Sequence, residues 1–181
     1  MDVRAHTNSD TPEGNDLSLS FLIQGEMSLL KGDLLAGLNH FDSASKCAPP
    51  TAQLFYRQGL SLFEYGSEEG REKALLLANK KFKHALNMDP KFFEGWQAWG
   101  NTLCLLGKTY NEHHYFLEAA DKYRKAIELA TSEDPSTLAN IYWDYGIVLG
   151  RIAEHSGEAD PGRGAPPRCA KSRSGETELS A

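Results

Sequence analysis

The chain has 181 residues, of which 40% are hydrophobic and 24% charged, a composition typical of a soluble globular protein with one domain or a short repeat array. Its formal net charge of −6 argues against nucleic-acid binding, which needs a basic surface, and no apolar run approaches the roughly 20 residues of a membrane-spanning helix. The three cysteines lie far apart, which favours a reducing compartment, and we expect the protein to be cytoplasmic.

Three regions of the chain differ in composition. Residues 1–16 contain several turn formers and no helical periodicity, so we expect a disordered N-terminal arm. In residues 17–156, apolar residues recur every three or four positions, which predicts amphipathic helices, and no stretch alternates as a strand does. Residues 157–181 are rich in Gly, Pro and Arg, so we expect a disordered tail. The predicted fold class is all-α.

Two spacing patterns recur in the helical region. An aromatic residue precedes a glycine by four positions at Phe21–Gly25, Phe55–Gly59, Trp96–Gly100 and Tyr142–Gly146. After the first three of these pairs comes a small residue, then an aromatic four positions later and an alanine three positions after that, in Gly37/Phe41/Ala44, Ala78/Phe82/Ala85 and Ala119/Tyr123/Ala126. Small residues let two helices approach closely, and aromatic rings fill the space beside them. The patterns predict a repeated pair of antiparallel helices.

This unit resembles the tetratricopeptide repeat (TPR), which has about 34 residues and a Trp-x-x-Leu-Gly…Ala-x-x-x-Phe…Pro pattern. The resemblance implies an α-solenoid of antiparallel helix pairs, a TPR array of about three and a half repeats over residues 17–156. The expected units are 17–50, 51–90, 91–135 and an incomplete unit at 136–156. Trp96 and Trp99 then belong to the core of the array.

The units differ in length. Gly25 and Gly59 are 34 residues apart, whereas the next two intervals, which end at Gly100 and Gly146, are 41 and 46 residues. The second and third units hold seven extra residues before the small residue of the second helix, so we expect lengthened second helices there. Ser67 and Asn111 each precede acidic residues and are expected to be the N-caps of these helices.

The fourth unit has an aromatic-rich first helix and no recognisable second helix. One interpretation is that the natural protein continues and that residues 157–181 are a non-native or frame-shifted tail. The other is that a partner or a second copy of the chain covers the open end, since repeat arrays normally end in a polar capping helix. Both interpretations stay open at this point.

The resemblance also implies that the first helices line a concave groove in which a protein or peptide partner binds. Its expected positions lie next to the signature residues and are Leu22, Glu26, Leu29, Tyr56, Leu60, Phe63, Gln97, Asn101, Trp143 and Ile147. We therefore expect a non-catalytic interaction scaffold or adaptor. The alternative is a small acidic TPR chaperone for a secreted or membrane-active client, similar to those of type III secretion. No catalytic motif occurs, and we expect no cofactor, no metal site, no nucleic acid and no membrane insertion.

Some TPR domains clamp the C-terminal carboxylate of a chaperone with a set of Lys, Asn and Arg residues in the groove. In this sequence Asn101 is the one clear agreement with that set. Glu26 would repel a carboxylate at the start of the groove. We therefore expect the carboxylate clamp to be absent.

Overall fold

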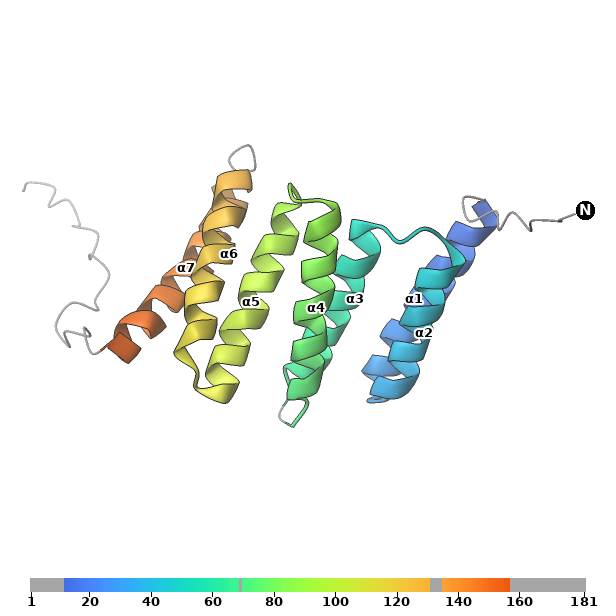
Figure 1. The fold of residues 1–181 in the computed structure, drawn as a ribbon, viewed down its shortest axis with the longest axis horizontal. Coiled ribbons are helices and arrows are strands. Elements are labelled where there is room, and N and C mark those ends of the chain that lie inside the picture. The colour runs from blue at the N-terminus through green and yellow to red at the C-terminus, as the bar shows by residue number, and fades with distance from the viewer. Residues whose placement is uncertain (1–11, 69, 131–134, 157–181) are drawn as a thin grey trace, which may run out of the picture.

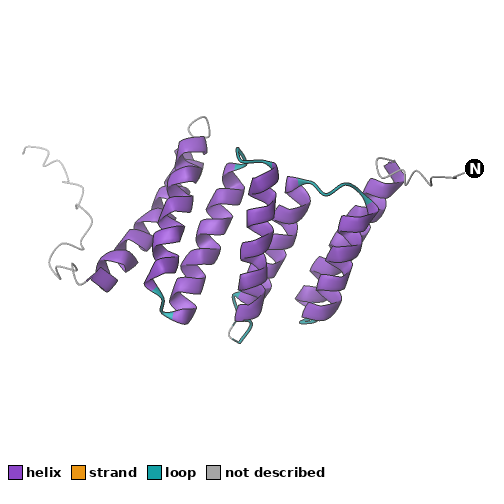
Figure 2. Ribbon diagram, viewed as in Figure 1, coloured by secondary structure: helices purple, strands orange, loops and turns teal. Residues whose placement is uncertain are grey.

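The computed structural model describes residues 12–68, 70–130 and 135–156, which form seven helices, and none of these residues lies in a strand (Figures 1 and 2). The helices are α1 (Pro12–Leu30), α2 (Leu34–Cys47), α3 (Ala52–Gly66), α4 (Glu72–Met88), α5 (Phe93–Tyr110), α6 (His113–Leu129) and α7 (Pro135–Ser156).

The helices stand side by side in chain order and pack as the antiparallel pairs α1–α2, α3–α4 and α5–α6, while α7 packs against α6 (Figure 1). We call α1, α3, α5 and α7 the first helices and α2, α4 and α6 the second helices. This arrangement confirms the predicted all-α solenoid of helix pairs. The last helix has no second helix paired with it among the described residues.

A glycine-to-aromatic contact joins the two helices of each complete pair. Gly25 faces the ring of Phe41, and a Cβ atom placed on Gly59 would lie 2.7 Å from Cε1 of Phe82. A Cβ atom on Gly100 would lie 3.0 Å from the ring of Tyr123. Real Cβ atoms essentially never lie as close to a ring as at Gly25 and Gly59, and the distance at Gly100 is shorter than most real Cβ contacts, so these rings occupy the space that a larger residue would need. The three aromatic residues are almost completely buried.

The first helix begins earlier than we expected. We predicted that residues 1–16 form a disordered arm, but α1 begins at Pro12, so the prediction is wrong for residues 12–16. Glu13 lies in the first turn, where its negative charge interacts favourably with the positive end of the helix dipole and stabilises the helix. Ser18 is buried and its hydroxyl donates a hydrogen bond of 2.8 Å to the carbonyl of Ala44, which ties this end of α1 to α2. Residues 1–11 lie outside the described residues.

The seven extra residues of the longer units are shared among several elements. Helices α4 and α6 have 17 residues each against 14 in α2, so the second helices are longer, as predicted, but by three residues. The remaining residues extend the C-terminal ends of α3 and α5, and in the second unit they also lengthen the loop before α4. Both helices of a hairpin therefore grow together, and the contact between Gly59 or Gly100 and its aromatic partner is kept.

The predicted N-caps at Ser67 and Asn111 are wrong, because both residues end the preceding helix. The Ser67 hydroxyl donates to the Phe63 carbonyl at 2.7 Å, within α3. Asn111 has a φ of 53° and is the left-handed C-cap of α5, a position that asparagine tolerates better than most residues. The residues that precede α4 and α6 are Arg71 and Glu112, and neither makes a side-chain capping hydrogen bond.

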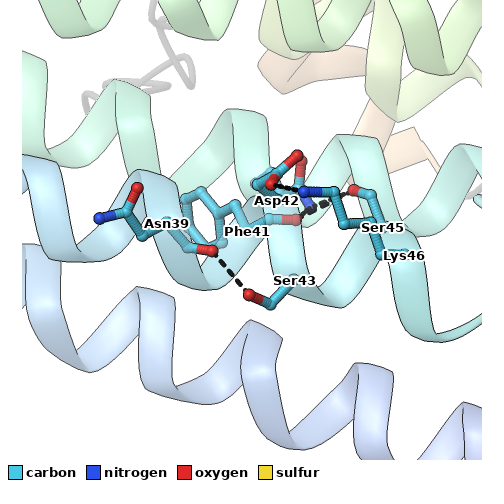
Figure 3. Close-up of polar contacts among 7 residues, drawn as sticks. Asn39, Phe41, Asp42, Ser43, Ser45 and Lys46 are labelled. Carbon is cyan, nitrogen blue, oxygen red and sulfur yellow. Dashed lines mark hydrogen bonds and ion pairs between the residues drawn. The ribbon is translucent and has the colours of Figure 1, made fainter.

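The junction between α2 and α3 is polar. The side chain of Gln58 is fully buried, and its amide nitrogen donates to the Phe41 carbonyl at 3.2 Å and to the Ser45 hydroxyl at 3.4 Å. Figure 3 shows Phe41 and Ser45 on α2, together with the ion pair of Lys46 with Asp42. These contacts connect the first helix pair to the second through hydrogen bonds as well as through apolar packing.

Trp96 and Trp99 are partly buried and pack against the apolar core. Their rings stack at a centroid distance of 5.7 Å, and the Lys122 ammonium lies 4.3 Å from the Trp99 ring. The Trp96 indole donates a hydrogen bond to the Pro90 carbonyl at 2.9 Å, and the Trp99 indole donates to Asn79. The two tryptophans therefore fasten α5 to α4 and α6, which agrees with their predicted place in the core.

The first helices share one face of the array. Each first helix contacts the next one, α1 with α3, α3 with α5 and α5 with α7, whereas successive second helices approach one another less closely. We call the face that the first helices form the inner surface of the array.

We predict that Gly100→Leu destabilises the array by about 1–3 kcal/mol, because the new side chain overpacks the contact with Tyr123. The free energy of unfolding from urea denaturation at low protein concentration measures this cost. Gly146→Leu is the matched control, because nothing lies within 4 Å of a Cβ atom at Gly146, and it should leave the stability unchanged or higher. Equal losses in the two variants would contradict the assigned contact.

Candidate partner-binding groove

The inner surface is hollowed between α1 and α3. A pocket of about 420 Å³ opens there, and the loop before α4 closes one end of it. Its apolar lining comes from Leu29, Leu30 and Leu60, and the Leu30 side chain is 84% exposed. Its polar lining comes from Glu26, Arg57, Ser61, Glu64, Tyr65, Glu68 and Arg71. We call this cavity the α1–α3 pocket.

Ion pairs organise the polar side of the α1–α3 pocket. The Arg57 guanidinium donates two hydrogen bonds of 2.9 Å to the carboxylate of Glu26, which links α3 to α1. Both hydrogen bonds come from the Nη2 nitrogen of Arg57, one to each carboxylate oxygen, and such charge-assisted bonds are stronger than those between neutral groups. Arg71 pairs with Glu68 at 2.9 Å, and its guanidinium also lies 4.3 Å from the centre of the Tyr65 ring.

Two further features define the rim of this pocket. The Tyr65 hydroxyl donates a hydrogen bond of 3.2 Å to the Gly32 carbonyl, which holds α3 against the turn after α1. Glu64 is exposed and forms no ion pair with any described residue. Because both arginines are already paired with carboxylates, Glu64 leaves the pocket rim with an excess negative charge.

A second pocket, of about 200 Å³, lies farther along the inner surface between α3, α5 and α7. Tyr123 and Cys104 contribute a hydroxyl and a thiol to it, and the Tyr123 hydroxyl donates a hydrogen bond to Asn101. Burial, with a smaller effect of the Asp144 carboxylate, raises the pKa of Tyr123 far above its usual value, so the hydroxyl stays protonated. Burial likewise raises the pKa of the Cys104 thiol. Protonated groups and apolar side chains make this pocket a poor site for nucleophilic chemistry.

The predicted groove residues divide among these hollows. Three line the α1–α3 pocket, namely Glu26, Leu29 and Leu60. Three line the second pocket, namely Phe63, Asn101 and Ile147. Leu22 lines a third pocket of about 190 Å³ at the other end of α1. Tyr56, Gln97 and Trp143 line none of these pockets.

Several predicted positions are occupied by contacts within the chain. Leu22 and Leu29 are 3% and 4% exposed and belong to the core between α1 and α2, so they offer a partner little surface. The Tyr56 ring lies 4.6 Å from the Phe92 ring, and it therefore fastens α3 to the next unit. The Gln97 amide donates to the Asp144 carboxylate at 3.1 Å, which connects α5 to α7. Trp143, by contrast, is 74% exposed.

Our sequence analysis missed Arg57, Glu64 and Arg71 as pocket residues. Arg57 and Glu64 follow one face of α3 with Ser61 between them, at helical spacings of four and three residues, and this periodicity was the available signal. The pairing of Arg57 with Glu26 had no such signal, because the two residues are 31 positions apart and meet only when α1 stands beside α3.

The described residues form no group of three or more His, Cys, Asp and Glu side chains that could hold a metal ion. Among the described helices, none has the length and apolar character needed to cross a membrane.

The fold is similar to that of a solved TPR domain, although no family model matches the sequence and no curated protein matches it. A chain described as the first TPR of Spaghetti (RPAP3), bound to the HSP90 peptide SRMEEVD, superposes with a TM-score of 0.56. The match covers 77% of this chain and 98% of that one, at 14% sequence identity. At this identity the likeness shows the fold, and it agrees with the TPR-like spacing of the helix pairs.

We predict that Cys104 reacts with iodoacetamide at neutral pH much more slowly than it does in the unfolded chain, because it is 7% exposed and burial raises its pKa. Since only the thiolate reacts, the rate should keep rising as the pH is increased beyond the normal range for a thiol. Mass spectrometry of labelled peptides gives the rate for each cysteine. An alkylation rate equal to that in denaturant would contradict the packing around the second pocket.

Proposed function

We propose that this protein is a non-catalytic interaction scaffold that binds a segment of a partner protein along its inner surface, with the α1–α3 pocket as the main anchor. The observation that carries the proposal is the composition of this pocket, a hollow of about 420 Å³ that combines the exposed Leu30 and the half-buried Leu60 with an ordered set of charged side chains. Concave sites that combine an apolar lining with a few fixed polar groups are typical of binding sites. The similar TPR domain was solved with a peptide bound, which supports the same class of function.

The charges of the pocket favour a particular kind of segment. Arg57 and Arg71 are engaged by Glu26 and Glu68, so neither is free to receive an acidic partner. Glu64 lacks an ion-pair partner among the described residues and stands close to the exposed Leu30. A complementary segment therefore places an apolar side chain against Leu30 and Leu60 and a lysine or arginine beside Glu64.

The peptide in the similar structure has a different character. Its sequence, SRMEEVD, ends in an aspartate, whose side chain and C-terminus supply two carboxylates beside those of the two nearby glutamates. In the α1–α3 pocket both arginines are already paired with carboxylates. In the second pocket Asn101 accepts the hydrogen bond of the Tyr123 hydroxyl, and Lys108 shares the lining with Asp144. We therefore propose a partner segment that is apolar and basic.

The alternative function, a chaperone for a secreted or membrane-active client, gains no support from the comparisons. We propose that the protein acts by binding and is not an enzyme. The partly or fully buried thiols of Cys47 and Cys104 are unpaired, which fits action in a reducing compartment such as the cytoplasm.

We predict that peptides selected from a random display library against the full chain carry an apolar anchor followed or preceded by Lys or Arg. Leu60→Ala should weaken their binding about 10-fold or more, because it removes the anchor's contact. Glu64→Lys should weaken binding by a similar factor, and replacement of the peptide's basic residue by Glu should restore binding to that variant. Fluorescence anisotropy with labelled peptides measures each dissociation constant.

Leu35→Ala is the matched control, because Leu35 is a 70% exposed leucine on α2 and lines none of the pockets described above. It should leave peptide affinity unchanged. The peptide SRMEEVD should bind with a dissociation constant above about 1 mM. Micromolar binding of SRMEEVD, or selected peptides that bind the Leu60→Ala and Glu64→Lys variants as well as the natural chain, would refute the proposal.

A further inference from the structure

The outer face of α7 is open. Tyr142, Trp143 and Leu149 are 55%, 74% and 45% exposed, and they surround Gly146, which is also exposed. The opposite face of the same helix carries Ile141 and Val148, which are fully buried in the core that α6 and α7 share. An apolar face of this kind on a terminal helix usually marks an interaction surface.

The corresponding face of α3 shows what this surface lacks. Counted from the signature glycines, Gly146 corresponds to Gly59 and Leu149 corresponds to Leu62. The ring of Phe82 on α4 fills the space over Gly59, and Leu62 is 0% exposed. Over Gly146 nothing lies within 4 Å of a Cβ position, and Leu149 is 45% exposed. Helix α7 therefore presents the first-helix half of a repeat, and no second helix among the described residues packs against that face.

The residues that follow α7 lack the chemistry of a second helix. In α2, α4 and α6 a phenylalanine or tyrosine fills the space over the glycine, with small residues four positions before it and three after it. Residues 157–181 contain no Phe, Tyr or Trp. No ring from this segment can therefore fill the space over Gly146.

Helix α7 itself carries the missing pattern. Ala139, Trp143 and Gly146 have the spacing of the second-helix signature, a small residue, an aromatic four positions later and a small residue three positions after that. These residues lie on the open face, because successive residues of a helix turn by about 100° and all three fall within about 60° of one direction. The same exposed face therefore carries an aromatic ring, Trp143, and an uncovered glycine, Gly146, over which such a ring can pack.

The contacts of the complete pairs give the register of the missing interaction. Within the α3–α4 pair, Gly59 contacts Phe82 and Gly66 contacts Leu75. Residue numbers therefore increase along α3 while those of the contacted residues decrease along α4. If a second α7 is laid on the first in this register, Trp143 of the second copy stands over Gly146, and Gly150 stands opposite Ala139 of the second copy. Because the two helices are identical and antiparallel, the second Trp143–Gly146 contact forms as well.

We propose that the chain self-associates as a two-fold symmetric dimer, in which the α7 helices of two copies pack antiparallel and each Trp143 fills the space over the other copy's Gly146. Small residues at the crossing allow the helices to approach as closely as those of a complete repeat. The α1–α3 pocket is lined by residues of α1, α3 and the loop before α4. Helices α1 and α3 lie toward the other end of the array from α7 (Figure 1), so this dimer leaves the pocket open in both copies.

Sedimentation velocity of the full chain from about 1 to 100 µM tests the dimer. The natural chain should show a concentration-dependent shift from monomer to dimer. Trp143→Ala should raise the dimer dissociation constant about 30-fold or more, because a buried tryptophan anchor is lost twice. Gly146→Leu should have a similar effect, because its side chain occupies the space that the indole needs.

A mixture of the two variants tests the register itself. The Gly146→Leu chain still supplies Trp143, and the Trp143→Ala chain still supplies Gly146, so a mixed dimer regains one complete contact. The mixture should dimerise more tightly than either variant alone. Leu117→Ala, at an exposed leucine on α6, is the control and should dimerise like the natural chain.

Circular dichroism of both variants should show full helicity, because Trp143 and Gly146 are exposed in the single chain. A natural chain that remains monomeric at 100 µM would overturn the proposal and leave the face to another partner. A dimer that Trp143→Ala and Gly146→Leu leave intact, or variants that stay apart when mixed, would overturn it equally.

Discussion

The contact of a glycine on one helix with an aromatic ring on the next sets the geometry of this array. It occurs between Gly25 and Phe41, between Gly59 and Phe82, and between Gly100 and Tyr123. A ring that lies where a Cβ atom would otherwise stand brings two helices close together and fixes their register, because a shift by one residue would drive the ring into a larger side chain. The distance between the helices, and hence the position of every other residue on them, follows from this contact.

Other features of the structure depend on this arrangement. The longer second and third units keep the contact because residues are added to both arms of the hairpin, beyond the glycine and before the aromatic residue. The close packing of the first helices on one another gives the inner surface and brings Glu26 of α1 within reach of Arg57 of α3. At Gly146 no ring takes the place that Phe41, Phe82 and Tyr123 take over the other three glycines, so this face of α7 is exposed.

The sequence predicted the helix pairs because the glycines and aromatic residues lie at fixed spacings, and those spacings are the packing contact itself. It failed where local preference and tertiary packing compete. Ser67 has the chemistry of an N-cap, but its hydroxyl bonds to the carbonyl of Phe63, and the next helix begins only at Glu72, after a lengthened loop. Leu22 and Leu29 were expected in the groove and are buried, because α1 turns these residues toward α2. The Glu26–Arg57 pair depends on how two helix pairs stack, which residue spacing within either helix does not reveal.

The most direct test of the central contact is nuclear magnetic resonance of the labelled chain at low concentration. The α protons of Gly25, Gly59 and Gly100 should show nuclear Overhauser effects to the rings of Phe41, Phe82 and Tyr123, with chemical shifts displaced by the ring currents. The α protons of Gly146 should show no such contact within the monomer, because nothing lies over that glycine. Absent ring contacts at the first three glycines, or the same contacts at all four, would contradict the account.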